Sequence, residues 1–404
     1  MQTQTDSPAS PQHASSAPVA SAVRDPGPGV RRGWTDETDP VRAAEALART
    51  AGGADVEAVL IFCSPDYDPE ALASALRSSF GETPLFGCTT AGEVAPVGYT
   101  SHSITAVGFP RGAFTVKSAL IDQLSNFELA NSRDLVHSLL GEAWTASPSP
   151  SRLGENSFAI MLVDGMSRKE EMLVSALYAE LGSIPLVGGS AGDSLGFERS
   201  LVLCNGRFHT NAALVLLVGT TRPFHVFQTQ HFTPTGTKMV ITSADPSRRL
   251  VREINAEPAA DEYARLVGVG RDELCPAVFA SHPVLVRVGG NHYVRSIQKV
   301  EEDGGLIFYC AIDEGVVLTA GNSIDIAANL EAQLQSLHED VGEPDIVLAF
   351  DCVLRRLEIE HRQLNRQISD ILVRHGVLGF NTYGEQFNNM HTSQTLTGIA
   401  IGKA

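Results

Sequence analysis

The sequence predicts a mixed α/β (α+β) fold, in which a duplicated β-α-β N-terminal domain precedes a mixed α/β C-terminal domain. Two observations lead to this class. Apolar, strand-like runs alternate with amphipathic helical patterns along most of the chain. One strand–helix–strand unit also recurs about 100 residues later, which indicates an internal repeat. The length of 404 residues is typical of two or three domains.

Each copy of the repeat opens with an apolar run, at 57–64 and 158–165, that predicts a buried strand. Asp68 before Pro69 predicts the start of the first helix, and Ser167 with Glu170 predicts a capping box for the second. After a shift of 101 residues many positions are identical, among them Glu70 and Glu171, Leu72 and Leu173, Gly81 and Gly182, Pro84 and Pro185, and Gly87 and Gly188. Each copy then ends in a Gly-rich loop with the pattern Ala-Gly-acid.

The domain boundaries follow from shifts in composition. Residues 1–39 are rich in Ser, Pro and Ala and predict a disordered tail without a signal peptide. Residues 40–220 predict the N-terminal domain, with the repeats at about 57–110 and 157–219. Residues 221–404 predict a second domain, because alternating strands, a Gly-Gly hairpin and a long helical pattern over 352–375 replace the repeat.

Charge and cysteine content exclude several classes of protein. There are 30 basic and 47 acidic residues, a formal charge of −17, which disfavours nucleic acids and anionic membrane surfaces as partners. No apolar run reaches the roughly 18 residues that a membrane-spanning helix needs. The six cysteines are scattered and form no C-x-x-C pair, as expected for reduced thiols in the cytoplasm. We therefore expect a cytoplasmic protein.

The two Gly-rich loops are the first candidates for a ligand pocket or a partner surface. Loops at the carboxyl ends of strands are where open α/β sheets bind ligands. The candidate residues are Cys88, Thr89, Gly92 and Glu93 in the first loop, and Gly189, Ser190, Gly192 and Asp193 in the second. A third candidate wall is the stretch 379–386, where Tyr383 and Glu385 lie among glycines, unless it is a packed β-corner.

The same loops also allow two enzymatic alternatives. Gly188–Gly192 fits the Gly-x-Ser-x-Gly pattern of a serine nucleophile, but no helical pattern follows, and the equivalent loop keeps no serine. Cys88 could carry an activated thiolate, but its equivalent in the second copy is Gly189. We therefore expect no catalytic residues and no enzyme.

Twelve histidines are present, and their spacing alone nominates no metal site. None forms the H-x-x-x-H or H-E-x-x-H pattern that places two imidazoles on one helical face. His225 and His231 are six residues apart in a strand-like stretch, and His391 lies in the C-terminal segment. By spacing alone, each is a surface residue or a hydrogen-bonded core residue.

Several of these segments together resemble FIST (F-box and intracellular signal transduction) proteins. They are the loops Gly87–Glu93 and Gly188–Asp193, the dipeptide Asp164-Gly165, the stretch 251–264 and the C-terminal GFNTYGEQ and HTSQT. The resemblance covers about residues 40–404 and implies a FIST N-terminal domain over 40–220 and a FIST C-terminal domain over 221–404. It further implies a sensory protein that binds a small ligand and signals through a partner protein.

The stretches QTQHFTPTG and GFNTYGEQFNNMH are similar to the stand-alone bacterial nitric-oxide-sensing haem proteins of this family. That resemblance implies haem b as cofactor, iron held only through haem, and nitric oxide as the signal. It also implies a partner such as a histidine kinase or a cyclic-di-GMP signalling protein. His391 is the first candidate for the haem ligand, followed by His231 and His225. The alternative is a FIST sensor of another small ligand, such as an amino acid, without haem.

Overall fold

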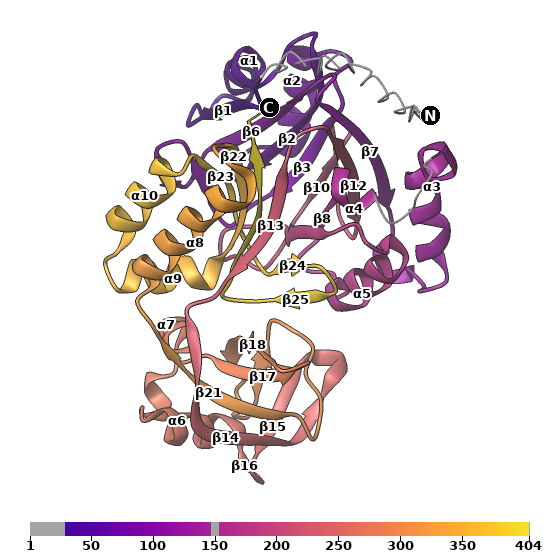
Figure 1. Cartoon of the computed structure of the whole chain (residues 1–404). Helices are drawn as coiled ribbons and strands as arrows, with labels where there is room; N and C mark the ends of the chain where they lie inside the picture. Colours follow the sequence, from indigo (N-terminus) through magenta and orange to yellow (C-terminus); the bar gives the residue numbers. More distant parts are fainter. Residues whose placement is uncertain (1–28, 147–152, 404) are drawn as a thin grey trace, which may run out of the picture.

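The structure, a computed structural model, describes residues 29–146 and 153–403 and confirms the predicted α/β class. Figure 1 shows a larger body with helices outside its sheets and a smaller, strand-rich lobe below it. Residues 1–28 of the expected tail lie outside the described residues. Arg31–Thr35 lie inside that expected tail but form strand β1, so the ordered part begins before residue 40. Pairing with β6 explains this, because it gives the backbone of these residues ladder partners.

The larger body contains three copies of one unit rather than two. Unit 1 comprises β1 (Arg31–Thr35), α1 (Pro40–Ala51), β2 (Val56–Cys63), α2 (Pro69–Phe80), β3 (Leu85–Thr89), β4 (Glu93–Ala95), β5 (Gly98–Thr100) and β6 (Ile104–Pro110). Unit 2 comprises β7 (Phe114–Ile121), α3 (Asn131–Ala146), α4 (Leu153–Asn156), β8 (Ser157–Val163), α5 (Glu170–Leu181), β9 (Leu186–Ser190), β10 (Val202–Cys204), β11 (Arg207–His209) and β12 (Ala213–Thr220). Unit 3 comprises β13 (Phe224–Thr229), α8 (Ile326–Val341), β22 (Pro344–Cys352), α9 (Val353–His361), α10 (Asn365–Arg374), β23 (Val377–Thr382), β24 (Glu385–Phe387), β25 (Met390–Thr392) and β26 (Leu396–Gly402).

The strand order shows that the three units are equivalent. The sheets run β1-β6-β2-β3-β10-β11, β7-β12-β8-β9-β24-β25 and β13-β26-β22-β23-β4-β5. Each unit thus builds four strands of its own sheet and lends its short hairpin to the edge of a neighbour's sheet. Because β4–β5 pair with β23, strand pairing crosses the expected boundary at 220/221. The exchange also covers one edge of each sheet, which protects it against further strand addition.

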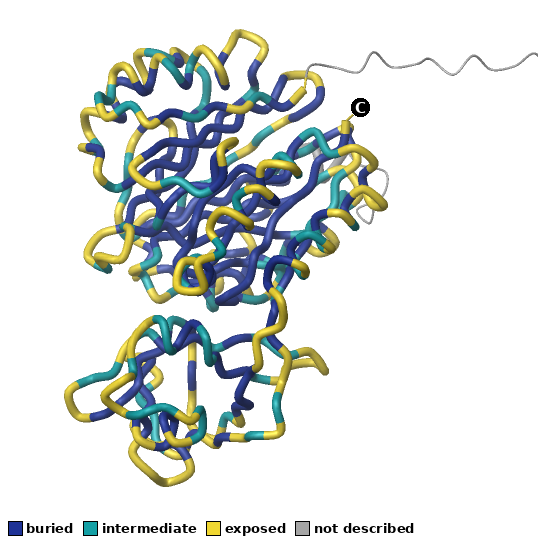
Figure 2. The backbone as a smooth tube through the Cα atoms, turned by 90° about the vertical axis from the view of Figure 1, so that its left-hand side faces the viewer, coloured by how far each residue is buried: buried dark blue, intermediate teal, exposed yellow. Residues whose placement is uncertain are grey.

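The smaller lobe is an insertion into unit 3, between β13 and α8. It contains β14 (Phe232–Asp245), β15 (Leu250–Ile254), β16 (Glu257–Pro258), α6 (Ala259–Val267), α7 (Pro276–Ser281), β17 (Val284–Val288), β18 (Asn291–Arg295), β19 (Ile297–Val300), β20 (Leu306–Phe308) and β21 (Val317–Ser323). These strands form one sheet, in which β16 pairs with β15. Figure 2 shows the narrow connection between the lobe and the larger body.

Local sequence sets the starts of three helices. The side chains of Asp39, Asp68 and Asp325 accept N–H groups of the first turns of α1, α2 and α8, as N-cap residues do. The capping box predicted at Ser167 does not form, because α5 begins only at Glu170 and has no side-chain cap. The long helical pattern over 352–375 is two helices, α9 and α10, separated where Gln363 adopts a φ of 57°.

The packing follows the threefold arrangement. One central core joins the facing sides of the three sheets and includes Phe62, Phe158 and Phe350, one from each unit. Phe62 also stacks on Phe380, with ring centroids 4.6 Å apart. Separate cores lie between each sheet and its own helices, and another fills the smaller lobe. The central core therefore fixes the three units against one another at the level of their strands.

Candidate functional site

Three Gly-rich loops meet where the parallel strands of the three units end. We call them loop 1 (89–93), loop 2 (189–194) and loop 3 (380–385); the sequence analysis identified all three as candidates. They form a closed ring of backbone hydrogen bonds. The N–H of Ala91 donates to the carbonyl of Asn381 (2.9 Å), that of Gly192 to Thr89 (3.0 Å), and that of Ser190 to Gly384 (2.9 Å). All three units therefore contribute backbone to one junction.

A glycine precedes each loop at the same structural position. A Cβ on Gly87 would lie 1.7 Å from the carbonyl oxygen of Ile61 in the neighbouring parallel strand. Gly188 and Gly379 show the same approach, at 1.9 Å and 1.8 Å. The third copy was missed in the sequence, although Gly379, Gly384 and Glu385 repeat the spacing of Gly87, Gly92 and Glu93. The insertion of the smaller lobe hides it, because it separates β13 from the rest of unit 3.

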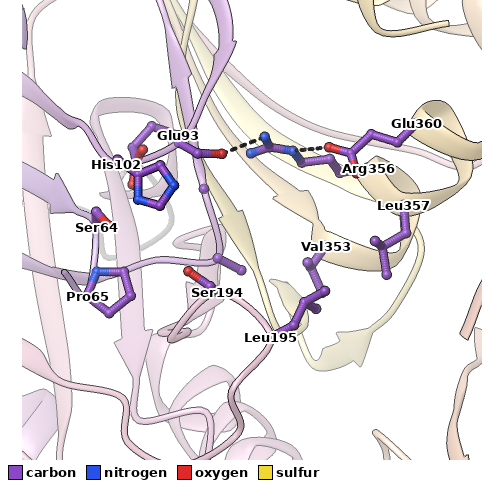
Figure 3. Close-up of a pocket in the computed structure, with 13 residues that line it drawn as sticks. Ser64, Pro65, Glu93, His102, Ser194, Leu195, Val353, Arg356, Leu357 and Glu360 are labelled. Carbon is purple, nitrogen blue, oxygen red and sulfur yellow. Dashed lines mark hydrogen bonds and ion pairs between the residues drawn. The ribbon is translucent and has the colours of Figure 1, made fainter. Parts of the chain in front are cut away.

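A cavity of about 250 Å³ opens beside this junction (Figure 3). All three units line it. The lining residues are Ser64, Pro65, Ala91, Gly92, Glu93, Ser101 and His102 from unit 1, Ser194 and Leu195 from unit 2, and Val353, Arg356, Leu357 and Glu360 from unit 3. Its wall combines hydroxyl groups and charges of both signs with apolar side chains. We refer to it as the axial cavity.

Arg356 on α9 is the cation of the axial cavity. Its Nη1 donates to the carbonyl of Thr100 and to Oδ1 of Asn381, both at 2.9 Å. Its Nη2 donates to Ser101 Oγ and its Nε to Glu360 Oε1, again at 2.9 Å (Figure 3). A guanidinium has five N–H donors, so these four bonds leave one donor for a ligand. The bonds also hold the guanidinium in place before any ligand arrives.

Glu93 lines the axial cavity and is itself fully buried. Its two carboxyl oxygens accept the hydroxyls of Thr90 and Ser103, the latter at 2.7 Å. Burial raises the pKa of Glu93 to about 7, although the hydroxyl bonds and Arg356 lower it. Near neutral pH this carboxyl therefore exchanges readily between charged and neutral forms.

The remaining loop residues are structural neighbours of the cavity. Among the sequence candidates, only Gly92 and Glu93 line it. A Cβ on Gly92 would lie 1.9 Å from Arg356 Nη1, so the guanidinium fits here only because residue 92 is glycine. Gly192 packs on Ala91, and Thr89 accepts the N–H of Leu201 at 2.9 Å. The candidates Arg356, Glu360 and Ser64 were missed, because only folding brings them beside loop 1.

Tyr383 and Asp193 join loop 3 to the segment after loop 2. The Tyr383 hydroxyl donates to Asp193 Oδ1. Asp193 also accepts the backbone N–H groups of Phe197, Glu198 and Arg199, at 2.7–2.8 Å. Residues 194–200, which we call the bridging loop, are thereby attached to one carboxylate. This loop supplies Ser194 and Leu195 to the axial cavity.

Glu385 is the unit 3 equivalent of Glu93 but does not line the cavity. It is fully buried and accepts the hydroxyls of Thr382 and Thr395. Burial raises the pKa of Glu385 to about 8. Threefold equivalence thus places two buried carboxyls in similar hydroxyl cradles, one at the cavity and one away from it.

The two candidate nucleophiles lie in unreactive settings. Cys88 is fully buried, and burial raises the pKa of its thiol well above the usual value, which suppresses the thiolate. The hydroxyl of Ser190 accepts a hydrogen bond from Gln386 Nε2 at 3.1 Å. Ser190 and Gly189 lie on β9, which pairs with β24 so that Gly189 lies opposite Glu385. Neither Cys88 nor Ser190 lines the axial cavity.

None of the three histidines proposed as haem ligands lines the axial cavity. His391 is 3% exposed on β25, its ring lies against Gly384, and its Nδ1 is 3.2 Å from Gln386 Nε2. Burial lowers the pKa of His391 to about 4, and the nearby charges are Glu171, Arg249 and Arg295. His231 is fully buried, with its Nε2 2.7 Å from Glu358 Oε2.

A b-type haem requires an apolar slot beside a free imidazole nitrogen. His391 has a neutral ring with charged neighbours. The Nε2 of His231 lies against a carboxylate, whereas its buried Nδ1 has no hydrogen-bond partner among the described residues. The His225 side chain is 43% exposed beside Asp340. Haem ligation by one of these histidines stays a prediction from the resemblance. Within the part of the chain that the structure describes, no group of three or more His, Cys, Asp or Glu side chains could hold a metal ion.

Two models of known domain families match the sequence. The sequence model of the FIST N domain matches residues 57–257, and that of the FIST C domain matches residues 259–388. A search among curated proteins finds none that matches the sequence. Among residues 29–146 and 153–403, no helix is both long and apolar enough to cross a membrane.

Proposed function

Because the chain belongs to the FIST family, whose domains are sensory modules of signal transduction that bind small ligands, we propose that it senses an amino-acid-sized zwitterion in the axial cavity. The observation that carries this proposal is the composition of the cavity wall. A volume of about 250 Å³ suits a small molecule, and Arg356 offers its remaining N–H to a carboxylate. Glu93 and Glu360 are acceptors for an ammonium group.

The position of the cavity supports a sensory role. Each unit contributes wall residues, so a ligand that contacts all of them stabilises one arrangement of the units. Helix α9 carries Arg356 on the cavity side and packs against α7 of the smaller lobe. A ligand that hydrogen-bonds to Arg356 can therefore shift α9, the helix that contacts the smaller lobe. A partner protein whose binding depends on the position of the smaller lobe would receive the signal.

The test is a thermal-shift screen of the full chain with the common amino acids, followed by calorimetric titration. A binding ligand raises the melting temperature, because it binds the folded state only; at 100 times Kd the gain is about 2.7 kcal/mol. Leu195→Trp fills the mouth of the cavity without removing a hydrogen bond, and we expect it to abolish the shift. The matched control is Leu129→Trp, at an exposed leucine outside the cavity.

A shift that survives in Leu195→Trp would place the ligand elsewhere and contradict the proposal. Haem binding and nitric-oxide sensing, with a histidine kinase or cyclic-di-GMP partner, stay predictions from the resemblance. Titration of the protein with haem, followed by its absorption spectrum, tests these predictions. A Soret band that His391→Ala abolishes would favour the haem sensor over the amino-acid sensor.

A further inference from the structure

A second cavity, of about 470 Å³, lies between α2 and the hairpin β10–β11. It gathers three arginines that are far apart in the sequence. Arg77 comes from α2, Arg199 from the bridging loop and Arg207 from β11, and Pro69, Glu70, Ala73 and Phe208 complete the wall. We propose that this cavity, which we call the arginine cavity, binds the phosphate group of a small phosphate monoester such as a nucleoside monophosphate.

Among the described residues, no ion pair neutralises the charges of these arginines. Across the described part of the chain, no carboxylate lies within 4.0 Å of the guanidinium of Arg77, Arg199 or Arg207. Glu70 is the one acidic residue of the wall and makes no such ion pair. In a chain of formal charge −17, three unneutralised guanidiniums around one cavity form a local field that attracts anions.

Backbone contacts hold two of the arginines in position. Arg77 lies over Gly206, the turn glycine of the β10–β11 hairpin, and its Nη1 donates to the carbonyl of that glycine. The backbone of Arg199 is fixed by its N–H bond to Asp193 Oδ2, at 2.8 Å. Arg207 is on a paired strand. Side chains whose anchors are already ordered lose less entropy when they bind a ligand.

Comparison with the equivalent junction shows that the arginines are not a general feature of the threefold fold. Where the hairpin of unit 1 meets α10 of unit 3, Gly98, the first residue of β5, packs on Ser369. The hydroxyl of Ser369 there accepts the N–H of Tyr99, at 3.2 Å. At that junction a small neutral side chain is enough for the hairpin to pack on the helix. The packing of units 1 and 2 therefore does not explain the three positive charges of the arginine cavity.

The wall chemistry selects the class of ligand. Guanidinium groups bind phosphate oxygens through paired N–H donors, and two or three of them can share one phosphate. Phe208 is half-buried and offers an aromatic surface in the same cavity, on which a planar base can stack. A phosphate attached to an aromatic base therefore uses both parts of the wall, whereas a simple carboxylate uses one.

Calorimetric titration of the full chain with AMP, adenosine and inorganic phosphate tests this inference. We expect AMP to bind, inorganic phosphate to bind more weakly, and adenosine to give no heat. The double variant Arg199→Gln with Arg207→Gln should weaken AMP binding at least tenfold; Arg77 stays unchanged, because it also packs on the hairpin. Arg248→Gln with Arg287→Gln, at two exposed arginines of the smaller lobe, is the charge-matched control and should bind as the original chain does.

Equal AMP affinity in the double variant and the control would overturn the proposal, as would the absence of binding by both phosphate compounds. Binding of a phosphoserine peptide but not of AMP would also overturn it, in favour of a docking site for a phosphorylated partner. Melting temperatures of both variants check that they fold. The outcome is independent of the amino-acid screen, since Leu195→Trp leaves all three arginines in place.

Discussion

Tyr383 stacks on Phe197, with ring centroids 4.6 Å apart and an interplanar angle of 25°. This contact attaches the bridging loop of unit 2 to loop 3 of unit 3, together with the hydrogen bond from the Tyr383 hydroxyl to Asp193. The bridging loop contributes Leu195 to the axial cavity and Arg199 to the arginine cavity. One short segment therefore connects the two proposed binding sites.

Tyr383→Ala should release the bridging loop. Removing a buried aromatic side chain costs about 3 kcal/mol, and Asp193 loses its hydroxyl donor as well. We expect faster amide exchange at Phe197, Glu198 and Arg199 and weaker binding at both cavities. Tyr383→Phe keeps the stacking and removes only the hydroxyl. Its amide exchange and its affinities should therefore lie between those of the original chain and those of Tyr383→Ala. Unchanged exchange in Tyr383→Ala would show that Asp193 alone fixes the loop.

Gly87→Ala tests the close approach of parallel strands in unit 1. The new Cβ would lie 1.7 Å from the carbonyl of Ile61, so β2 and β3 must separate. We expect a loss of about 3 kcal/mol in the free energy of unfolding, measured by urea denaturation. The control is Gly112→Ala, where φ is also positive but nothing lies within 4 Å; that change should cost only about 1–2 kcal/mol.

Arg249 links the smaller lobe to the larger body. Its Nη2 donates to Glu170 Oε2 at 2.8 Å and to Glu171 Oε2 at 2.7 Å. Arg249→Met removes the partner of the buried Glu170 carboxylate and of the partly buried Glu171, which costs about 3–5 kcal/mol. Burial raises the pKa of Glu170 to about 7, so the cost should be smaller at pH 5.5, where this carboxyl is protonated, than at pH 8. Urea denaturation at the two pH values measures the difference.

The double variant Arg249→Met with Glu170→Gln provides the check on that explanation. It removes the charge that Arg249 compensates, so it should recover part of the lost stability at pH 8. If the single and double variants lose the same free energy at pH 8, uncompensated charge on Glu170 is not the cause.

Glu385 should make the protein less stable as the pH rises. Its pKa is about 8 in the folded protein, against an ordinary value of 4.5, so the folded state holds a proton that the unfolded chain releases. The resulting stabilisation is fully present below pH 4.5 and is lost as the pH rises through about 8. For one group the slope is at most about 1.4 kcal/mol per pH unit.

Glu385→Gln should remove that contribution and flatten the dependence of unfolding free energy on pH between 5 and 8. Asparagine at Glu385 would be too short to reach both Thr382 and Thr395, so glutamine is the appropriate neutral replacement. An unchanged slope in Glu385→Gln would mean that the carboxyl titrates near its ordinary pKa.

Thiol labelling should distinguish Cys275 from the other five cysteines. All six are free, and Cys275 alone is exposed. Burial raises the thiol pKa of Cys63, Cys88 and Cys352, which slows their reaction further. We expect one thiol to react rapidly with a disulfide reagent in the native protein and all six after denaturation. Rapid labelling that persists in Cys275→Ser would show that a buried cysteine becomes accessible.

Sequence reasoning located the α/β class and the loops, because both leave a local signature. Alternating apolar runs reflect burial of strands, and Gly87 and Gly188 are glycines because strand contact excludes a Cβ. Loop 3 was found as a candidate but not as a third copy. Its unit is interrupted by an insertion, and comparing adjacent segments does not detect a unit whose first strand lies far from the remainder.

The cavities themselves could not be predicted. Arg356, Ser64 and Leu195 meet only because the three units close around a common core, and Arg77 meets Arg207 only because unit 2 lends its hairpin to the sheet of unit 1. Hairpin exchange is a matter of edge pairing between distant strands, and short strands carry almost no sequence information about their partner.

By itself the sequence determined the composition class, the acidic charge, the helix start at Asp68, and the glycines that strand packing requires. Those features depend on interactions between residues close in the chain or on steric limits at single positions. Tertiary structure alone decided which loops meet, which charges face a cavity and which histidines are buried. These properties depend on contacts across hundreds of residues, and no local pattern records them.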